Sequence, residues 1–457
     1  GPYLVGGITG ISLVEVVRTV VMTADILKLK HKKFQFLIMD DKQFFDRIPQ
    51  ESHSTAGAHV GLGTKEELDI QIQGFSTVIP LGDYETGQDA NARGAPQGTV
   101  QGCHVGNTCA LPMMHAINQR YSSHSADIMR TNIKRYVDDS ACYAVEEPRA
   151  KGDVKIPHPA QGMLVDATTY FWGLMQIDTP HKKIQYYSDG AHPTIVLPTK
   201  ECREGHLGSF WTTDTQEQRD DVLKGGSTVR STSQVTYLGC TVCFTSGARV
   251  PHDIEEIRRD TQRQMENVRL APAAAMMMID SKVPTRWYTV ASIYRPTREH
   301  HRVNGKLLLR IYKITTGLSR YAKTEALWAP QKDSGMGLMR ADARYAVAVQ
   351  REWIRHYGGS KQHFRDGLVE YMKEIHDHFG GCPAVLLPYQ RSVQEGTHVW
   401  TCLQHAVTQV GLPMWLPGMC HKTTHIILRH RDREGASPPP EEVVWNTKFG
   451  PVRAVRV

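Results

Sequence analysis

The spacing of apolar residues predicts a helix followed by a buried strand near the start of the chain. From Ile11 to Lys30, apolar residues recur at three- and four-residue intervals, which is the period of one face of an α-helix. The run from Phe34 to Met39 is largely apolar and has the length of a strand, and Asp40 follows it directly. This order places a carboxylate at the end of a core strand.

A second acidic position lies between two short runs that suit a pleated sheet. In the segment 133–143, aromatic, β-branched and other apolar residues stand on both sides of Asp138 and Asp139. Asp-Asp is a common turn pair, so an ordinary β-hairpin turn accounts for it. Alternatively, the turn exposes two carboxylates that hold a divalent metal ion against a phosphate-bearing substrate. A third carboxylate elsewhere in the chain decides between these interpretations.

Three carboxylates near the first strand compete to be that third group. Asp40, Asp41 and Asp46 flank Phe44 and Phe45. They could instead form the acidic N-terminus of a helix, which the helix dipole favours. Of these, Asp40 follows the apolar run directly, which makes it a candidate metal ligand at the C-terminal end of a core strand.

A glycine- and proline-rich turn lies between the two acidic positions. Pro96 and the glycines at 94 and 98 restrict or free the backbone around Gln97, whose side-chain amide can both donate and accept hydrogen bonds. Such a turn can bring the main chain close to a ligand. A plain loop before the apolar, helix-like segment 100–117 is the alternative interpretation.

Composition is compatible with a polyanionic partner and gives no sign of a membrane segment. The 457 residues are enough for two to four domains, and 54 Lys+Arg against 47 Asp+Glu give a net charge of +7. No apolar run approaches the roughly 20 residues of a membrane-spanning helix. Nine irregularly spaced cysteines favour a reducing, intracellular compartment. The chain begins at Gly1 without a signal-peptide pattern, so we expect a fragment or processed piece.

Three patterns, taken together and in chain order, resemble motifs A, B and C of the reverse transcriptase palm. They are Asp40-xxxx-Phe45-Asp46, Gly94-Ala95-Pro96-Gln97-Gly98 and Tyr136-Val137-Asp138-Asp139. Further on, the segment 173–178 with Lys182 is similar to motif D, and Tyr237-Leu238-Gly239 resembles the strand that grips the primer end. Trp328-Ala329-Pro330, followed by Gly335-Met336-Gly337-Leu338, resembles a segment beyond the thumb in non-LTR (LINE-like) retrotransposon proteins.

The resemblance implies an α+β fold with a polymerase right-hand palm. That palm is an antiparallel sheet with helices, followed by an α-helical thumb and a mainly helical C-terminal region. The expected parts are a fingers remnant (1–33), the palm (34–187), a surface insertion (188–232), a primer-grip strand region (233–250), the thumb (251–345) and a C-terminal region of unknown role (346–457). Because most of the fingers are missing, we expect this chain alone to be weak or inactive as a polymerase.

The implied activity is RNA-directed DNA synthesis by a non-LTR retrotransposon protein, which adds dNTPs to a primer 3′-hydroxyl. Template RNA, a DNA primer or target DNA, and dNTPs are the implied partners, and the location is nuclear if the element is eukaryotic. Oligomeric state is left open. Other interpretations are a group II intron-type or other cellular reverse transcriptase, an RNA-dependent RNA polymerase, or an inactive palm fragment that binds RNA.

The resemblance also assigns roles to residues. Asp40, Asp138 and Asp139 would be catalytic and hold two Mg²⁺ ions, or Mn²⁺ in their place; carboxylates suit such hard cations. Phe45 would exclude a ribose 2′-hydroxyl, and Gln97, Gly98 and Lys182 would bind the nucleotide. The primer grip would comprise Tyr136, Tyr237, Leu238 and Gly239. In the helical region 253–318, the thumb residues Arg258, Arg259, Arg263, Arg302 and Lys306 would follow the duplex backbone, although solvated helix faces account for each basic residue separately.

Overall fold

The chain forms two compact units, which are described separately. A computed structural model describes residues 12–49, 80–81, 84–85, 100–125, 131–148, 150–205, 210, 215–244, separate positions between 256 and 293, 298–329, 331–333, 335–358, 362–379, 385–386, 398–410, 414–415, 442–447 and 450–455. One unit comprises Gly1–Thr23 and Lys30–Phe244, and the other comprises Ala24–Leu29 and Thr245–Val457.

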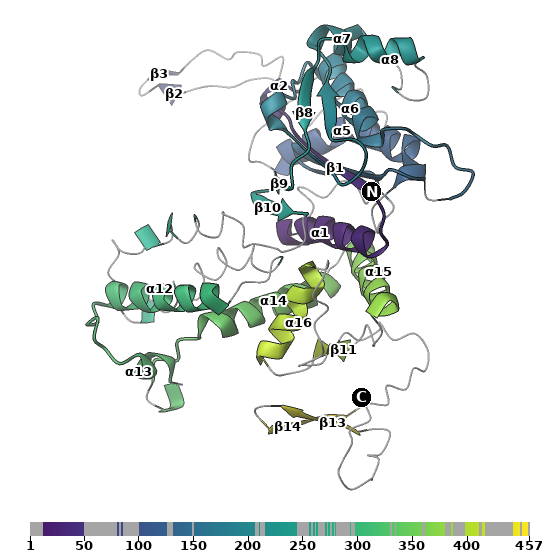
Figure 1. Ribbon diagram of the computed structural model, residues 1–457. Helices are drawn as coiled ribbons and strands as arrows, with labels where there is room; N and C mark the ends of the chain where they lie inside the picture. Colours follow the sequence, from purple (N-terminus) through teal and green to yellow (C-terminus); the bar gives the residue numbers. More distant parts are fainter. Residues whose placement is uncertain are drawn as a thin grey trace. The chain divides into compact units, whose positions relative to one another are not determined.

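The first unit is built around a four-stranded antiparallel sheet with the strand order β4-β5-β1-β6. Its strands are β1 (Phe34–Asp40), β4 (Ile133–Tyr136), β5 (Asp139–Val145) and β6 (Ile184–Ser188). Helix α5 (Val100–Arg120) precedes β4, and helix α6 (Pro159–Met175) connects β5 to β6. Each helix therefore lies in a crossover between two strands that have a third strand between them, as in a split βαβ arrangement (Figure 1).

Both faces of β1 are buried, which explains its largely apolar sequence. Leu37 and Met39 belong to the core shared with α5 and α6. On the other face, Phe36 stacks on Tyr143 with ring centroids 5.9 Å apart. Successive side chains of a strand alternate between its faces, so even-numbered residues of β1 point away from the two helices. The predicted strand after the first helix is confirmed, and that helix is α1 (Leu13–Leu29).

The segment 188–232, predicted as a surface insertion, has a buried side. It contains β7 (Thr194–Leu197), α7 (Lys200–Gly205), α8 (Gln216–Leu223) and β8 (Ser227–Arg230), and β7 pairs with β8. Ile195, Leu197 and Val229 join the same core as the central sheet and its helices. The segment is therefore packed into the first unit along one face.

The first unit ends in a tight hairpin of β9 (Gln234–Tyr237) and β10 (Cys240–Cys243). Its turn residues Leu238 and Gly239 have φ values of 51° and 71°. Two positive φ values match a type I′ turn, whose twist suits a two-residue hairpin. Shorter elements of this unit are α2 (Phe44–Arg47), β2 (Pro80–Leu81), β3 (Tyr84–Glu85), η1 (Ser122–His124) and η2 (His181–Lys183).

The second unit is mainly helical, and α14 is at its centre. Helix α14 (Ala341–Tyr357) packs against α12 (Arg298–Thr316), α15 (Gln362–Phe379) and α16 (His398–Val410). The remaining elements are α13 (Thr324–Trp328), η3 (Gln331–Asp333), the strand pair β11 (Val385–Leu386) and β12 (Met414–Trp415), and the strand pair β13 (Glu442–Thr447) and β14 (Gly450–Val455). Within the described residues, no helix combines the length and apolar character needed to cross a membrane.

The structure is thus of the mixed α+β type that the sequence predicts, with small antiparallel sheets and many helices. The antiparallel sheet and its two covering helices span residues 34–188, whereas the predicted palm spans residues 34–187. The helical region predicted from residue 253 is described as a continuous helix from Arg298, in α12.

Candidate acidic site

Three carboxylates meet at one end of the central sheet. Asp40 ends β1 and stands directly opposite Asp139, the first residue of β5. Tyr136 of β4 pairs with Asp139, so Val137 and Asp138 form a two-residue turn between the strands. The strand pairing therefore brings together Asp40, Asp138 and Asp139, although about a hundred residues separate the first from the other two.

These carboxylates lie on the sheet face away from α5 and α6. Met39 and Ser140 pair with each other, and Met39 belongs to the core on the helix side. Alternation then turns their neighbours Asp40 and Asp139 to the opposite face. Earlier β1 residues on that face are buried, and its partly exposed end at Asp40 is termed the open face. The Asp40 side chain is 30% exposed. This carboxylate is therefore accessible to solvent.

Mutual repulsion and partial burial disfavour full ionisation of this cluster. The pKa of Asp139 is raised to about 7, mainly by burial and in addition by the neighbouring charges of Asp138 and Asp40. Arg135 and Lys183 act in the opposite direction. Because the negative charges are incompletely compensated, a cation at this edge of the sheet is favoured.

Lys183 supplies one such positive charge. Its ammonium forms a short ion pair with the Asp40 carboxylate. The hydrogen bond to Asp40 raises the pKa of Lys183. Lys182, which the sequence predicts to bind the nucleotide, is exposed and makes no such contact in the described structure. The strand register explains the difference: Ile184 pairs with Met39, so Lys183 falls opposite Asp40.

Mg²⁺ suits the donor chemistry of this site. Among the described residues, no group of three or more Asp, Glu, His or Cys side chains lies close enough together to hold a metal ion. The Asp40 carboxylate is paired with Lys183. The three carboxylates nevertheless offer oxygen ligands from adjoining strand ends, the kind that Mg²⁺ prefers. Burial, and in addition the charges of Asp138 and Asp40, raise the pKa of Asp139, and a divalent cation beside the three carboxylates would favour their ionised form.

Beneath the turn, on the helix side of the sheet, lies a buried ion pair. The Arg135 guanidinium donates to the Asp41 carboxylate over 2.9 Å, and the two side chains are 0% and 2% exposed. Thr179 donates a further hydrogen bond of 2.7 Å to Asp41. Burial raises the pKa of Asp41, and Arg135 opposes that effect. No role is predicted for Arg135 from the sequence, and Asp41 is predicted only as an alternative to Asp40.

Phe45 lies close to this buried pair but is itself largely covered. It is 9% exposed in the short helix α2, where its ring is 5.6 Å from that of Phe44. Gly106 of α5 allows this packing, because a Cβ added there would lie 2.7 Å from the Phe44 ring. Asp46, the third acidic candidate of the sequence, is exposed on the same helix.

The hairpin predicted to grip a primer is fastened beside β6. The Gln185 side chain donates to the Thr236 carbonyl over 3.0 Å and accepts from the Thr236 amide over 2.7 Å. Tyr237 is only 1% exposed, and burial raises its pKa, with Asp139 the largest charge contribution. Tyr136 is half-buried. The surface positions of the hairpin turn are therefore Leu238 and Gly239.

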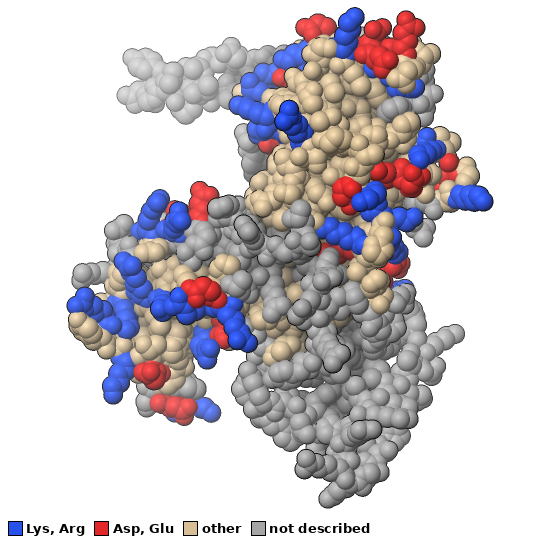
Figure 2. All heavy atoms as spheres, in the orientation of Figure 1, with Lys and Arg blue, Asp and Glu red and all other residues tan. Residues whose placement is uncertain are grey.

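Of the predicted nucleic-acid contacts, Arg302 and Lys306 lie on an exposed face of α12. Arg298 and Arg310 continue the same row, whose four-residue spacing corresponds to about 6 Å along the helix. Figure 2 shows basic side chains gathered over this helix. Arg302 also pairs with Glu299. Arg259 and Arg263 are exposed, whereas Arg258, Gln97 and Gly98 lie outside the described residues.

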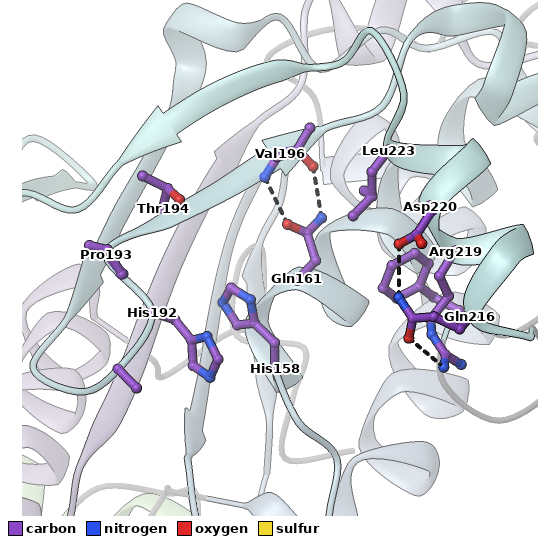
Figure 3. A pocket seen from close by; sticks show the side chains of 12 residues that line it. His158, Gln161, His192, Pro193, Thr194, Val196, Gln216, Arg219, Asp220 and Leu223 are labelled. Atoms are coloured by element: carbon purple, nitrogen blue, oxygen red, sulfur yellow. Dashed lines mark hydrogen bonds between the residues drawn. The ribbon is translucent and has the colours of Figure 1, made fainter.

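A separate pocket of about 310 Å³ lies beside the start of α6 (Figure 3). His158 and His192 line it, with rings stacked 4.0 Å apart. Burial lowers the pKa of His158 to about 3, which keeps its ring neutral near pH 7. Gln161 is held by two hydrogen bonds of 2.7 Å to the main chain of Val196. None of the three clustered carboxylates lines this pocket.

No protein-family model matches this chain, and no curated protein gives a significant match to it. The acidic edge of the sheet and the order of the motifs in the sequence are therefore the features that bear on function.

Proposed function

We propose that the chain is the palm-containing part of an RNA-directed DNA polymerase of the non-LTR retrotransposon type. The observation that carries the proposal is the pairing of Asp40 with Asp139, next to Asp138 in the turn, on the open face of an antiparallel sheet. This arrangement presents three carboxylates to a phosphate-bearing substrate. The order of the motifs in the sequence supports RNA as the template and dNTPs as the substrates.

In the proposed reaction, the primer 3′-hydroxyl attacks the α-phosphate of a dNTP, and pyrophosphate leaves. Two Mg²⁺ ions, when bound by the three aspartates, would stabilise charge on the attacking and leaving oxygens. Asp40 and Asp139 approach from neighbouring strands, so the sheet fixes their separation. Lys183 places a positive charge beside Asp40, where the triphosphate would add negative charge.

The proposed primer and duplex contacts use surfaces that the structure describes. Leu238 and Gly239 form the turn of a hairpin that Gln185 fastens next to β6. The basic row on α12 suits a phosphate backbone, because its charges share one exposed helix face. Phe45 is proposed to limit space beside the nucleotide sugar.

A single-turnover assay tests this function. Purified chain in excess over an RNA template with an annealed DNA primer is mixed with dNTPs and Mg²⁺, so that even slow incorporation is measured. Asp138→Asn should reduce extension by about a hundredfold to a thousandfold, which corresponds to the several kcal/mol that metal ligation supplies. Undiminished extension by Asp138→Asn would contradict the metal-site assignment. Asp153→Asn, at an exposed position, is the matched control.

A second candidate is an RNA-binding module without polymerase activity. The exposed row Arg298, Arg302, Lys306 and Arg310 favours nucleic-acid binding whether or not the acidic edge is catalytic. Fluorescence anisotropy with a labelled single-stranded RNA, measured at several salt concentrations, tests it. Salt-dependent binding without any primer extension would favour this candidate.

A further inference from the structure

The buried Arg135 guanidinium contacts the chain next to each of the three clustered carboxylates. It donates to the Val137 carbonyl over 2.6 Å, to the Ser140 hydroxyl over 2.7 Å and to the Asp41 carboxylate over 2.9 Å. These three acceptors are the immediate neighbours of Asp138, Asp139 and Asp40, respectively. One rigid, planar group therefore links the three backbone positions that set the spacing of the acidic site.

Burying the ion pair of Arg135 and Asp41 costs free energy unless further contacts compensate for it. Burying two opposite charges carries a desolvation penalty that a single contact does not repay. Arg135 compensates by using several donors, and Asp41 accepts a second hydrogen bond from Thr179. The guanidinium carbon also lies 4.4 Å and 4.6 Å from the ring centroids of Phe44 and Phe171. These contacts hold its plane in one orientation.

The turn that Arg135 supports is strained. Val137 has a φ of 61°, in the left-handed region that β-branched residues rarely adopt. Its carbonyl accepts the shortest of the three Arg135 hydrogen bonds. Strained backbone persists where surrounding contacts over-determine it, and here those contacts come from Arg135.

We propose that Arg135, anchored by Asp41, is a positioning residue that fixes the separation and direction of Asp40, Asp138 and Asp139 for metal binding. This inference rests on the proposed function, since it assigns a support to the same site. Arg135 touches neither substrate nor metal ion. It acts through the backbone of the turn and through the end of β1.

The decisive variant is Arg135→Lys in the full chain. It retains the positive charge, but a single ammonium cannot reproduce the planar set of donors to three acceptors. Mn²⁺ titration, followed by electron paramagnetic resonance, measures metal affinity independently of activity. We expect Mn²⁺ affinity and kcat each to fall about tenfold to a hundredfold, as for other groups that orient metal ligands. KM for dNTP should change less than about twofold, since the nucleotide contacts remain.

Asp166→Asn is the matched control. Asp166 is also a buried carboxylate in an ion pair of the first unit, with Arg120 at 2.7 Å, and it accepts from Tyr121 as well. Arg120 is the last residue of α5. In the same helix, Asn118 accepts a hydrogen bond of 3.3 Å from the amide of Ile133, at the end of β4 that is away from the acidic turn. The control should lower Tm without changing Mn²⁺ affinity or kcat.

The double variant Arg135→Met with Asp41→Leu covers the case in which Arg135→Lys does not fold. Removing both charges avoids an unpaired buried ion, and such replacements are often neutral for stability. Weakened Mn²⁺ binding by a folded variant supports the inference. Wild-type Mn²⁺ affinity and kcat in a folded variant would overturn it and leave Arg135 a purely structural role.

The outcomes also separate this inference from the proposed function. If the wild-type chain binds Mn²⁺ through Asp138 but Asp138→Asn leaves primer extension undiminished, the polymerase proposal fails, and the metal affinity of the variants still decides the role of Arg135. If the wild-type chain binds no Mn²⁺, both proposals are overturned.

Discussion

The two faces of the central sheet treat two consecutive aspartates in opposite ways. Asp40 points to the open face and joins Asp139 and Lys183 in a partly exposed charged cluster. Asp41, the next residue, is 4% exposed on the helix side, where Arg135 and Thr179 hold it. Consecutive residues at the end of a strand point to opposite faces of the sheet, so one aspartate lies in the proposed metal site while the next one supports the structure.

The comparison is tested most strongly by changing each aspartate to asparagine. Asp40→Asn should reduce primer extension by about a hundredfold to a thousandfold, because it removes a proposed metal ligand. The free energy of unfolding of this variant should differ from wild type by less than about 1 kcal/mol, since the ion pair of Asp40 with Lys183 is partly exposed. Asp41→Asn should instead lower the free energy of unfolding by about 3–5 kcal/mol, because it leaves Arg135 without a buried counter-charge.

Urea unfolding followed by circular dichroism gives the stability, and single-turnover extension gives the activity. The division of roles would be wrong if Asp40→Asn lost as much stability as Asp41→Asn while retaining activity.

A smaller effect should distinguish the two adjacent lysines. Lys183→Met removes the cation that holds Asp40, whereas Lys182→Met changes an exposed side chain. If Lys183 gives a proton to the leaving pyrophosphate in addition to holding Asp40, its replacement should slow incorporation about a hundredfold. This is at the lower end of the effects of general acid catalysis. Lys182→Met is the matched control and should remain close to wild type. Equal losses in pre-steady-state incorporation would show that the strand register does not select between them.

The sequence predicted the acidic edge well because its determinants are local. An apolar run that ends at Asp40 and a hairpin pattern around Asp138 suffice to place carboxylates at strand ends. The structure brings these strand ends together through the pairing of β1 with β5. The functional roles of these residues remain predictions, as do those of Gln97 and Gly98, which lie outside the described part of the chain.

The supporting residues were harder to predict because their roles depend on strand register. Lys183 faces Asp40 only because Ile184 pairs with Met39. Arg135 is a charged residue inside a strand, and its burial follows from a partner 94 positions away in the sequence. Its two-residue spacing from Ile133, which belongs to the helix-side core, was the available signal that Arg135 also points inward.

The smallest expected effect concerns the packing of the Phe44 ring between α5 and the Arg135 guanidinium. A Cβ at Gly106 would lie 2.7 Å from the Phe44 ring, so Gly106→Ala should lower the free energy of unfolding by about 1–3 kcal/mol through overpacking. Gly173→Ala is the matched control on α6, because no heavy atom lies within 4 Å of the added Cβ. It should raise stability by about 0.5–1 kcal/mol through its greater helix propensity.

Thermal and urea unfolding measure both glycine variants, and Mn²⁺ affinity shows whether the disturbance reaches the open face. If Phe44 only fills space, Gly106→Ala weakens folding and leaves Mn²⁺ affinity unchanged. If the ring also fixes the plane of Arg135, affinity falls together with stability, and by less than in Arg135→Lys, because the three hydrogen bonds of the guanidinium remain available. A loss of affinity in Gly173→Ala of the same size would show that the metal site responds to any change in the helix layer, which would remove the distinction between the two faces.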